Sequence, residues 1–279
     1  MDQVPAPHAV CYRHPNRPTR LRCSECGRSI CVECSNDAAV GQKCPDCAVP
    51  KGRNRVFTAR NITHTDRRTT PLTMALIAIN VGIWLLATLV PDLGDRMFEN
   101  GVQWRPFVEQ GEWWRGLTAM FLHADGFTHI LFNTWALWVF GPALERRWGT
   151  IPFGALYLAA GLNGAALFHA LGNTSPAVGA SGAIFGLFGA LLLGTYRQRH
   201  TAMGRAAFNQ LGILLAINLA LPIIIPRIAW EAHVGGLIAG VIITLAWERL
   251  PSQGPGISMQ RSIVALAVAT AAVLMLILL

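Results

Sequence analysis

Apolar residues in this chain gather into seven long blocks, separated by short polar stretches. Most blocks approach the roughly 20 residues that an α-helix needs to cross a bilayer. They predict membrane-spanning helices near 72–90, 127–143, 151–171, 181–197, 207–225, 230–247 and 262–279. The pattern therefore predicts an all-α polytopic membrane protein, with a six-helix bundle and a C-terminal seventh helix.

The composition supports this fold class. Of the 279 residues, 52% are hydrophobic and 14% are charged, whereas about a quarter of the residues in a soluble protein are charged. The first apolar block begins well inside the chain, near residue 72, and lacks a small-residue cleavage site, so it is not expected to be a signal peptide.

Basic residues are distributed unequally between alternate connecting segments. With the N-terminus in the cytosol, the outer segments carry only Arg96, Arg105, Arg115 and Arg227. The inner segments carry Lys51, Arg53, Arg55, Arg60, Arg67, Arg68, Arg146, Arg147, Arg197, Arg199, Arg205, Arg249 and Arg261. The positive-inside rule then predicts a cytoplasmic N-terminus and an external C-terminus. The absence of an organelle-targeting segment and the compact design favour the plasma membrane. The net charge of +8 is explained by topology, and nucleic acid is not an expected partner.

The first fifty residues predict a metal-binding module. All seven cysteines fall here, in two-residue-spaced pairs that His14 completes; the pairs are Cys11 with His14, Cys23 with Cys26, Cys31 with Cys34, and Cys44 with Cys47. Eight soft ligands suffice for two structural, tetrahedral zinc ions. The odd cysteine count and a reducing compartment argue against disulfides. Such a short module cannot bury a large core, so metal must supply most of its folding free energy.

The spacing leaves the ligand pairing open. Alternate pairs sharing a metal would make a cross-brace, and sequential pairs would make two ribbons. The module resembles B-box-like zinc modules, which favours the cross-brace. A structural role or the binding of a cytosolic protein partner is expected for it.

Polar side chains converge at one end of the predicted bundle. The second, fourth and sixth spans run in the same direction, and each carries polar residues near its start. These are His129 and Asn133, four residues apart on one helical face, then Ser181, and then His233. Placing polar side chains in the membrane costs free energy, so several of them at the same depth indicate a function. The pattern predicts a reaction site near the outer leaflet.

Small residues predict that two of these helices pack closely. Gly182, Gly186, Ala190 and Gly194 recur every fourth residue in the fourth span, and Gly236 and Gly240 do so in the sixth. Such stripes let helix backbones approach each other in lipid. The pattern predicts that His233 is brought towards Ser181.

The residue types favour serine-dependent hydrolysis. A neutral imidazole can take the proton of a serine hydroxyl near neutral pH. The Ser181 backbone N–H, the Asn133 amide and the His129 ring are candidate donors to a developing oxyanion. Since Glu231 is the only nearby acid on a span and is expected to face elsewhere, the pattern predicts a Ser181–His233 dyad. A lone serine at a helix start is usually a cap, and a lone membrane histidine usually a packing residue, so the prediction rests on their joint occurrence.

From about residue 72 to 248 the chain resembles the rhomboid family of intramembrane serine proteases. The resemblance rests on a set of motifs in order: Trp114-Arg115, Phe121-Leu122-His123 with His129-x3-Asn133, Gly141-x3-Glu145-x3-Gly149, Gly179-Ala180-Ser181-Gly182, and His233-Val234-Gly235-Gly236. It implies a six-helix bundle with a water-filled cavity open to the outside. It further implies Ser181 as nucleophile, His233 as base, and single-span membrane proteins as substrates.

The resemblance also implies supporting roles at the substrate site for Gly179, Phe185 and Gly236. Phe185 stands where family members often have tyrosine, and its ring is expected to stack on His233 without offering a hydroxyl. The expected domains are a zinc module over 1–50, a basic linker over 51–71, a protease core over 72–250, and a linker with the seventh helix over 251–279.

Two other functions compete with a protease. The first is a catalytically idle relative that binds membrane clients, against which the presence of both Ser181 and His233 argues. The second is a transporter, which would need an acidic residue near mid-membrane for ion coupling, and no such residue interrupts the predicted spans.

Overall fold

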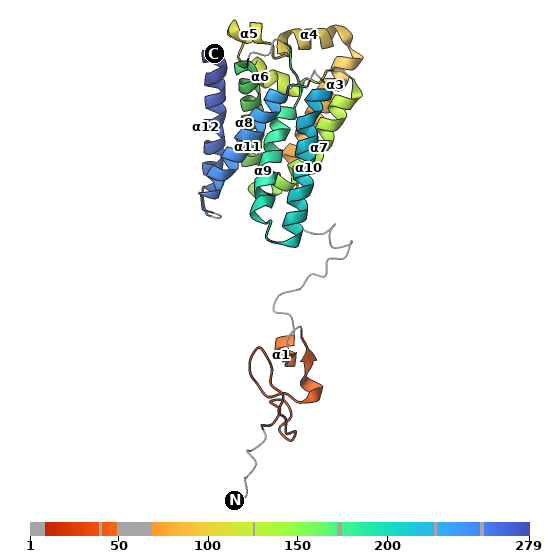
Figure 1. The fold of residues 1–279 in the computed structure, drawn as a ribbon, viewed down its shortest axis with the longest axis vertical. Coiled ribbons are helices and arrows are strands. Elements are labelled where there is room, and N and C mark those ends of the chain that lie inside the picture. Colours follow the sequence, from red (N-terminus) through yellow and green to blue (C-terminus); the bar gives the residue numbers. More distant parts are fainter. Residues whose placement is uncertain are drawn as a thin grey trace, which may run out of the picture. The chain divides into compact units, whose positions relative to one another are not determined.

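The computed structural model describes residues 9–38, 41–48, 69–124, 126–171, 175–225, 228–251 and 254–279. The chain divides into two compact units, Met1–Arg67 and Arg68–Leu279, called here the N-terminal unit and the helical unit (Figure 1). The basic linker expected over 51–71 lies outside the described residues up to residue 68.

In the described part of the helical unit there are seven long helices, at the places where the apolar blocks predicted them. Figure 1 shows their arrangement. They are α3 (Pro71–Leu89), α7 (Phe127–Trp148), α8 (Thr150–Ala170), α9 (Ser181–Arg197), α10 (Ala202–Ile224), α11 (Trp230–Glu248) and α12 (Ile257–Leu278). The all-α fold class is thereby confirmed. α10 and α12 begin earlier than predicted, because their first two turns contain polar residues, such as Arg205 and Arg261, that a hydropathy pattern leaves out.

Within the described residues, five helices have the length and composition to cross a membrane, namely α3, α8, α10, α11 and α12. The other two long helices, α7 and α9, do not meet these criteria of length and composition. α7 carries Glu145, Arg146 and Arg147 in its last turns, and α9 has 17 residues. Both pack among the spanning helices, and α9 has most of its residues buried.

Short elements complete both units. α4 (Pro91–Gly101), α5 (Arg105–Glu109), α6 (Arg115–Thr118) and the 3-10 helix η2 (Ala119–Phe121) connect α3 to α7. In the N-terminal unit, η1 (Val32–Cys34) precedes a two-stranded antiparallel sheet of β1 (Asn36–Asp37) and β2 (Gln42–Lys43), and α1 (Pro45–Ala48) follows.

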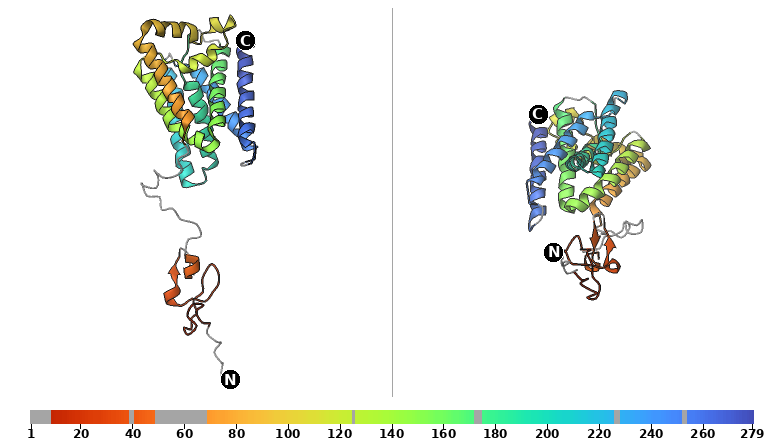
Figure 2. Two further views of the ribbon diagram at one scale, coloured as in Figure 1. Left: turned by 180° about the vertical axis from the view of Figure 1, so that it is seen from behind. Right: turned by 60° about the horizontal axis from the view of Figure 1, so that its bottom comes forward.

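α8 forms the centre of the helical unit. It packs against α9, α11 and α12, and its side chains Phe153, Leu156, Tyr157 and Phe168 are almost fully buried. α12 and α3 lie at opposite edges of the bundle (Figure 2). The predicted seventh helix is therefore an integral part of the bundle, and the Asn163 side chain of α8 donates a hydrogen bond to the Val268 carbonyl of α12 at 3.2 Å.

The closest helix contact joins α9 to α11 through glycines, as the small-residue stripes predicted. A Cβ atom on Gly236 would collide with the carbonyl of Gly182, and one on Gly240 would collide with the carbonyl of Gly186. The backbones therefore touch directly over two turns. Gly194 departs from the predicted face, because it lies beside Arg147 of α7.

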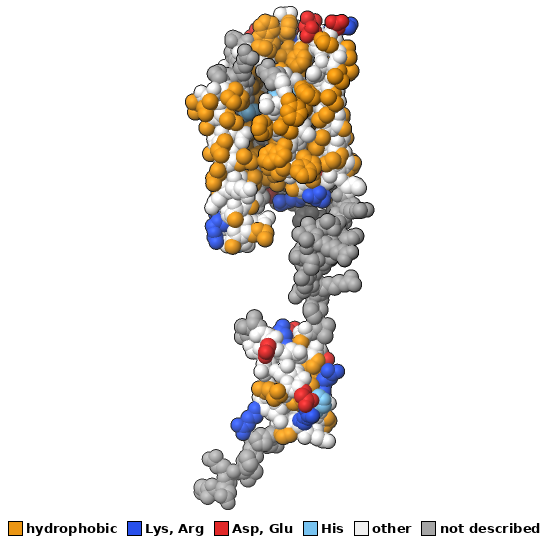
Figure 3. Space-filling view, turned by 90° about the vertical axis from the view of Figure 1, so that its right-hand side faces the viewer, with side chains coloured by type: hydrophobic (Ala, Val, Ile, Leu, Met, Phe, Trp, Pro, Cys, Tyr) orange, Lys and Arg blue, Asp and Glu red, His pale blue; other side chains and the backbone are white. Residues whose placement is uncertain are grey.

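Charged side chains gather at the two ends of the helical unit, and those at one end are mostly arginines (Figure 3). The end where α7, α9 and α11 begin is called the Ser181 end, and the opposite end is called the basic end. The basic end carries Arg146, Arg147, Arg197, Arg199, Arg205, Arg249 and Arg261. Hydrophobic side chains cover the surface between them, which is the distribution expected of a bilayer-spanning bundle.

Glu145, near the end of α7, fixes the start of α3. Its carboxylate accepts hydrogen bonds from the backbone N–H groups of Leu72 and Thr73, at 3.0 and 2.9 Å, and from the Thr73 hydroxyl at 2.6 Å. A buried carboxylate at a helix N-terminus satisfies unpaired N–H groups and interacts favourably with the helix dipole. The Glu145 motif found in the sequence thus joins two helices.

We expect Gly240→Val to destabilise the helical unit by about 1–3 kcal/mol, the usual cost of overpacking, because the new side chain must push α11 away from the Gly186 carbonyl. Gly212→Val on α10 is the matched control, since nothing lies within 4 Å of a Cβ there. Thermal unfolding in detergent measures the difference. Equal melting temperatures for the two variants would contradict the glycine contact.

Candidate active site

Ser181 is the first residue of α9, and the backbone before it is held in a fixed shape. Gly179 adopts a φ of +123°, which side chains with a Cβ rarely adopt, and its N–H donates to the Ala119 carbonyl at 2.8 Å. Ala177 exchanges two backbone hydrogen bonds with Gln103, at 3.1 and 2.8 Å. This pairing ties the approach to Ser181 to the α4–α5 connection.

His233, in the first turn of α11, reaches Ser181 directly. Its Nε2 atom lies 2.9 Å from the Ser181 Oγ. The His233 ring is buried, and its Nδ1 has no hydrogen-bond partner in the described part of the chain. Two polar groups that are 52 residues apart in the sequence thus form one hydrogen bond.

Phe185 fixes the plane of the His233 ring. The two rings stack with centroids 4.1 Å apart and an angle of 8° between them. The stacking expected from the sequence is therefore confirmed. Because Phe185 lies one turn after Ser181 on α9, the same helix supplies the hydroxyl and the surface that orients its partner.

His129 lies against the loop that precedes Ser181. A Cβ on Gly179 would come within 2.7 Å of the His129 Nε2, so only glycine allows this approach. The His129 Nδ1 lies 3.1 Å from the Ala124 carbonyl oxygen, which can only accept, so Nδ1 carries a proton. The Nε2 atom that faces Gly179 can then donate only when the ring is doubly protonated. His123 packs edge-on against the same ring, with centroids 5.2 Å apart.

Asn133 lies one turn after His129 and is buried. Its Nδ2 donates one hydrogen bond to the His129 carbonyl at 2.9 Å. An amide nitrogen has two hydrogens, so a second donor is left for another acceptor. Unlike the His129 ring, this donor does not depend on protonation.

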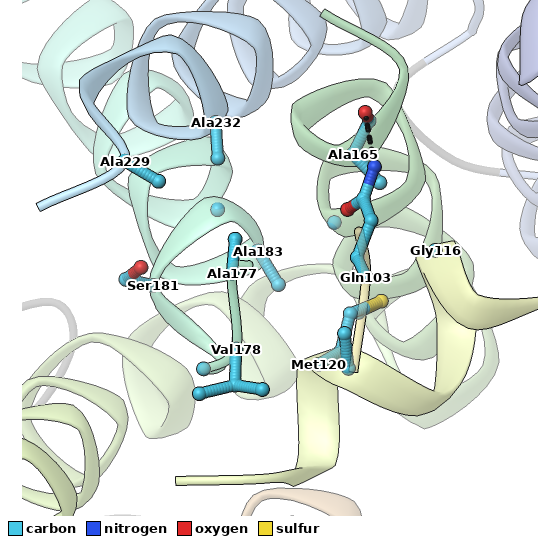
Figure 4. Close-up of a pocket in the computed structure, with 14 residues that line it drawn as sticks. Gln103, Gly116, Met120, Ala165, Ala177, Val178, Ser181, Ala183, Ala229 and Ala232 are labelled. Atoms are coloured by element: carbon cyan, nitrogen blue, oxygen red, sulfur yellow. Dashed lines mark hydrogen bonds between the residues drawn. The ribbon is translucent and has the colours of Figure 1, made fainter. Parts of the chain in front are cut away.

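A small pocket of about 30 Å³ adjoins Ser181 (Figure 4). Small residues line most of it, including Gly161, Ala165, Ala183 and Ala232. Gln103 also lines it, and its Nε2 donates to the Ala165 carbonyl at 2.8 Å (Figure 4). Sequence reasoning missed Gln103, because a single amide in a polar loop carries no spacing signal.

Glycine at Gly236 supports the site through packing, since it allows α11 to carry His233 up to Ser181. Arg115, of the Trp114-Arg115 motif, supports the segment between α4 and α7. The Arg115 guanidinium is buried, donates to the carbonyls of Glu99 and Val102, and forms an ion pair with Glu112 at 2.5 Å.

In the N-terminal unit, the eight sequence-predicted ligands form two groups that could each hold a metal ion. One contains Cys11, His14, Cys31 and Cys34, and the other contains Cys23, Cys26, Cys44 and Cys47. Within each group the ligand atoms lie within 4.8 Å of one another. Alternate pairs are thus brought together, which is the cross-brace of the two arrangements that the sequence left open. All seven cysteines are free of disulfides.

The distances within these groups match a tetrahedral metal site. The thiols of Cys31 and Cys34 lie 3.3 and 3.4 Å from His14 Nδ1, and those of Cys26 and Cys44 lie 3.7 Å apart. With the bond lengths that zinc forms to sulfur and nitrogen, the edges of a tetrahedron measure about 3.5–3.8 Å. The donor set therefore fits zinc.

Thiol acidity in the second group is uneven. Backbone N–H groups of Cys26 and Cys44 lower the pKa of the Cys23 thiol to about 6. The neighbouring Cys44 thiol and burial raise the pKa of Cys47 to about 12. Thiolates crowded together repel each other, and a bound cation removes that repulsion. Arg28 adds positive charge, with its Nε 3.3 Å from the Cys26 sulfur.

A serine hydrogen-bonded to a histidine is an arrangement typical of serine hydrolases, and here it stands at one end of a membrane-spanning helical bundle. Residues 110–249 match the family model described as the Rhomboid domain. The chain belongs to the rhomboid family.

Three relatives define the extent of the similarity. The chain is 39% identical to "Rhomboid protease GluP" of Bacillus subtilis over 154 residues, which cover 55% of this chain and 30% of GluP. It is 34% identical to "Putative rhomboid protease YdcA" of Bacillus subtilis, covering 62% of this chain and 87% of YdcA. It is 30% identical to "Rhomboid protease AarA" of Providencia stuartii, covering 64% of this chain and 73% of AarA.

We expect Gly179→Ala to slow labelling of Ser181 by a fluorophosphonate probe about tenfold or more, because the new methyl group must displace the His129 ring. Gly111→Ala is the matched control. Gly111 also has a positive φ, of +94°, but nothing lies within 4 Å of its Cβ position. Melting temperatures are measured alongside, so that a slower labelling rate is not confused with a loss of folding. Equal labelling rates in the two variants would contradict the role assigned to the contact between Gly179 and His129.

Proposed function

We propose that the protein is an intramembrane serine endopeptidase that cleaves transmembrane protein substrates with a Ser181–His233 dyad. The 2.9 Å contact between His233 Nε2 and Ser181 Oγ carries this proposal. Membership of the rhomboid family supports it, as does the similarity to the rhomboid proteases GluP and AarA.

The chemistry begins with proton transfer. Nε2 of His233 takes the Ser181 proton as Oγ attacks the carbonyl carbon of the scissile peptide bond, and the imidazolium then protonates the leaving amine. Water hydrolyses the acyl-enzyme with His233 acting again as base. The unpartnered His233 Nδ1 favours a dyad over a triad, because no carboxylate accepts a hydrogen bond from it in the described part of the chain.

Three groups are proposed to stabilise the oxyanion. The backbone N–H of Ser181, at the start of α9, has no intrahelical acceptor and lies at the positive end of the helix dipole. The second amide hydrogen of Asn133 is a neutral donor. His129 donates through Nε2 only as an imidazolium, because its Nδ1 proton is directed at the Ala124 carbonyl.

Pocket size indicates what the site accepts. A volume of about 30 Å³ next to Ser181 has room for a small side chain or a water molecule, not for an aromatic ring. A peptide bond inside a helix is also inaccessible, so helix-breaking residues near the cleavage point would aid attack. We therefore propose substrates with small residues beside the scissile bond and a locally weak helix.

The proposed topology places the Ser181 end outside the plasma membrane and the N-terminal unit in the cytosol, because the basic end carries most of the arginines of the helical unit. The N-terminal unit is proposed to hold two structural zinc ions, one in each ligand group, and to offer a surface for a cytosolic protein partner. Zinc supplies folding free energy there and takes no part in hydrolysis.

For the dyad, we expect Ser181→Ala and His233→Ala each to reduce cleavage of a transmembrane test substrate by about a thousandfold or more, as in other enzymes that use a serine and a histidine together. Purified protein in liposomes and a gel assay of substrate cleavage provide the measurement. Ser258→Ala and His200→Ala change the same residue types at exposed positions and should leave cleavage unchanged.

Cleavage that persists in Ser181→Ala would refute the mechanism. A wild-type protein that binds the test substrate but never cleaves it would instead favour the catalytically idle client-binding function.

For the metal sites, we expect two zinc ions per chain by elemental mass spectrometry of the full-length protein. Cys34→Ser removes a ligand from one group only and should lower the count to one. Ser35→Ala, the neighbouring residue, is the control and should keep two. A count of two in Cys34→Ser, or a metal other than zinc in the wild type, would contradict the assignment.

A further inference from the structure

Three helix ends meet at the basic end of the helical unit, around a pair of tryptophans. The rings of Trp148, at the end of α7, and Trp247, near the end of α11, pack edge to face with centroids 4.8 Å apart. Trp247 Nε1 donates to the carbonyl of Arg261, in the second turn of α12, at 2.8 Å. The tryptophan pair therefore joins the seventh helix to α7 and α11.

Two arginines flank this tryptophan pair. The guanidinium of Arg147 lies 5.3 Å from the centroid of the Trp148 ring. The side chain of Arg261 is half-buried, and its Nε is a buried donor with no hydrogen-bond partner in the described part of the chain. Both arginines therefore adjoin the same tryptophan pair, Arg147 at the Trp148 ring and Arg261 where its carbonyl accepts from Trp247.

Nearby carboxylates do not compensate these two charges. Glu145 is occupied by the start of α3 and by the Thr150 hydroxyl, and Glu248 pairs with Arg197 at 2.8 Å. Within the described residues, neither Arg147 nor Arg261 forms an ion pair. Like charges close together and a buried unpaired donor both cost free energy, so the site is complementary to an anion.

The chemistry of the missing anion follows from the donors. Guanidinium groups bind phosphate oxygens through two parallel N–H donors, and a phosphodiester offers oxygens to two arginines at once. The site lies where helices end, so the anion is found at the membrane surface. Beside Arg261, the exposed face of α12 is apolar, with Met259, Ile263 and Leu266 more than half exposed.

We propose that the phosphate of an anionic phospholipid binds between Arg147 and Arg261, with its acyl chains along the exposed apolar face of α12. A free phosphate ion would use the same guanidinium groups but gain nothing from Met259 and Ile263. The basic end is also the one expected to face the cytosol, where anionic lipids are enriched. The bound lipid holds α12 onto α7 and α11, which gives the seventh helix a role in stability that depends on the surrounding lipid.

The test uses the full-length protein in detergent with added phosphatidylglycerol, phosphatidylcholine or inorganic phosphate. Native mass spectrometry measures retained lipid, and thermal unfolding measures stabilisation. We expect phosphatidylglycerol to be retained and to raise the melting temperature, and phosphatidylcholine and inorganic phosphate to do neither. Loss of one charge-assisted hydrogen-bonding group should weaken lipid binding about tenfold.

The variants are Arg147→Gln and Arg261→Gln, with Arg205→Gln as the control. Arg205 carries the same charge at the same end, on the first turn of α10, so its removal should leave binding unchanged. Arg147 is exposed, and its replacement should not impair folding. Equal retention of phosphatidylglycerol in all three variants would overturn the proposal, as would equal stabilisation by inorganic phosphate.

Discussion

Direct contact between the backbones of α9 and α11 is the constraint on which the helical unit depends. In a bilayer, apolar side chains gain little by leaving lipid for protein, so helices associate through close packing. Gly182 and Gly186 on α9 meet Gly236 and Gly240 on α11 with no side chain between them. Only at this separation can the His233 imidazole reach the Ser181 hydroxyl.

Packing also orients the His233 ring beside Ser181. In many serine hydrolases a carboxylate orients the histidine, whereas here the Phe185 ring stacks on His233 from the helix that carries Ser181. Orientation is thus supplied by packing, which costs no buried charge. The segment before Ser181 is instead held by backbone hydrogen bonds to Gln103 and to the Ala119 carbonyl.

Buried polar groups elsewhere in the chain connect secondary-structure elements through hydrogen bonds. Glu145 joins α7 to the start of α3, and Arg115 supports the segment between α4 and α7. In the N-terminal unit, each of the two groups that could hold a metal ion brings together side chains from distant parts of the sequence. A unit of this size buries little apolar surface on which to fold. Arg147 and Arg261 differ from these groups, because neither has an ion-pair partner among the described residues.

The sequence alone determined the helices, the candidate site residues and the ligand pairs. These follow from local patterns: the length of an apolar block, the four-residue spacing of His129 and Asn133, and the two-residue spacing of each cysteine pair. Parallel direction of α7, α9 and α11 followed from counting spans. Helix starts were less accurate, because Arg261 and other polar residues extend α12 beyond its apolar block.

Only the tertiary structure decided which of these elements touch. The hydrogen bond between Ser181 and His233, the alternate grouping of the cysteine pairs and the capping of α3 by Glu145 join residues that are far apart in the chain. Gln103 had no signal in the sequence, and the proton on His129 Nδ1 became evident only from the Ala124 carbonyl beside it. A sequence pattern specifies which face of a helix carries apolar or small residues. Which other helix packs against that face depends on the packing of the whole bundle.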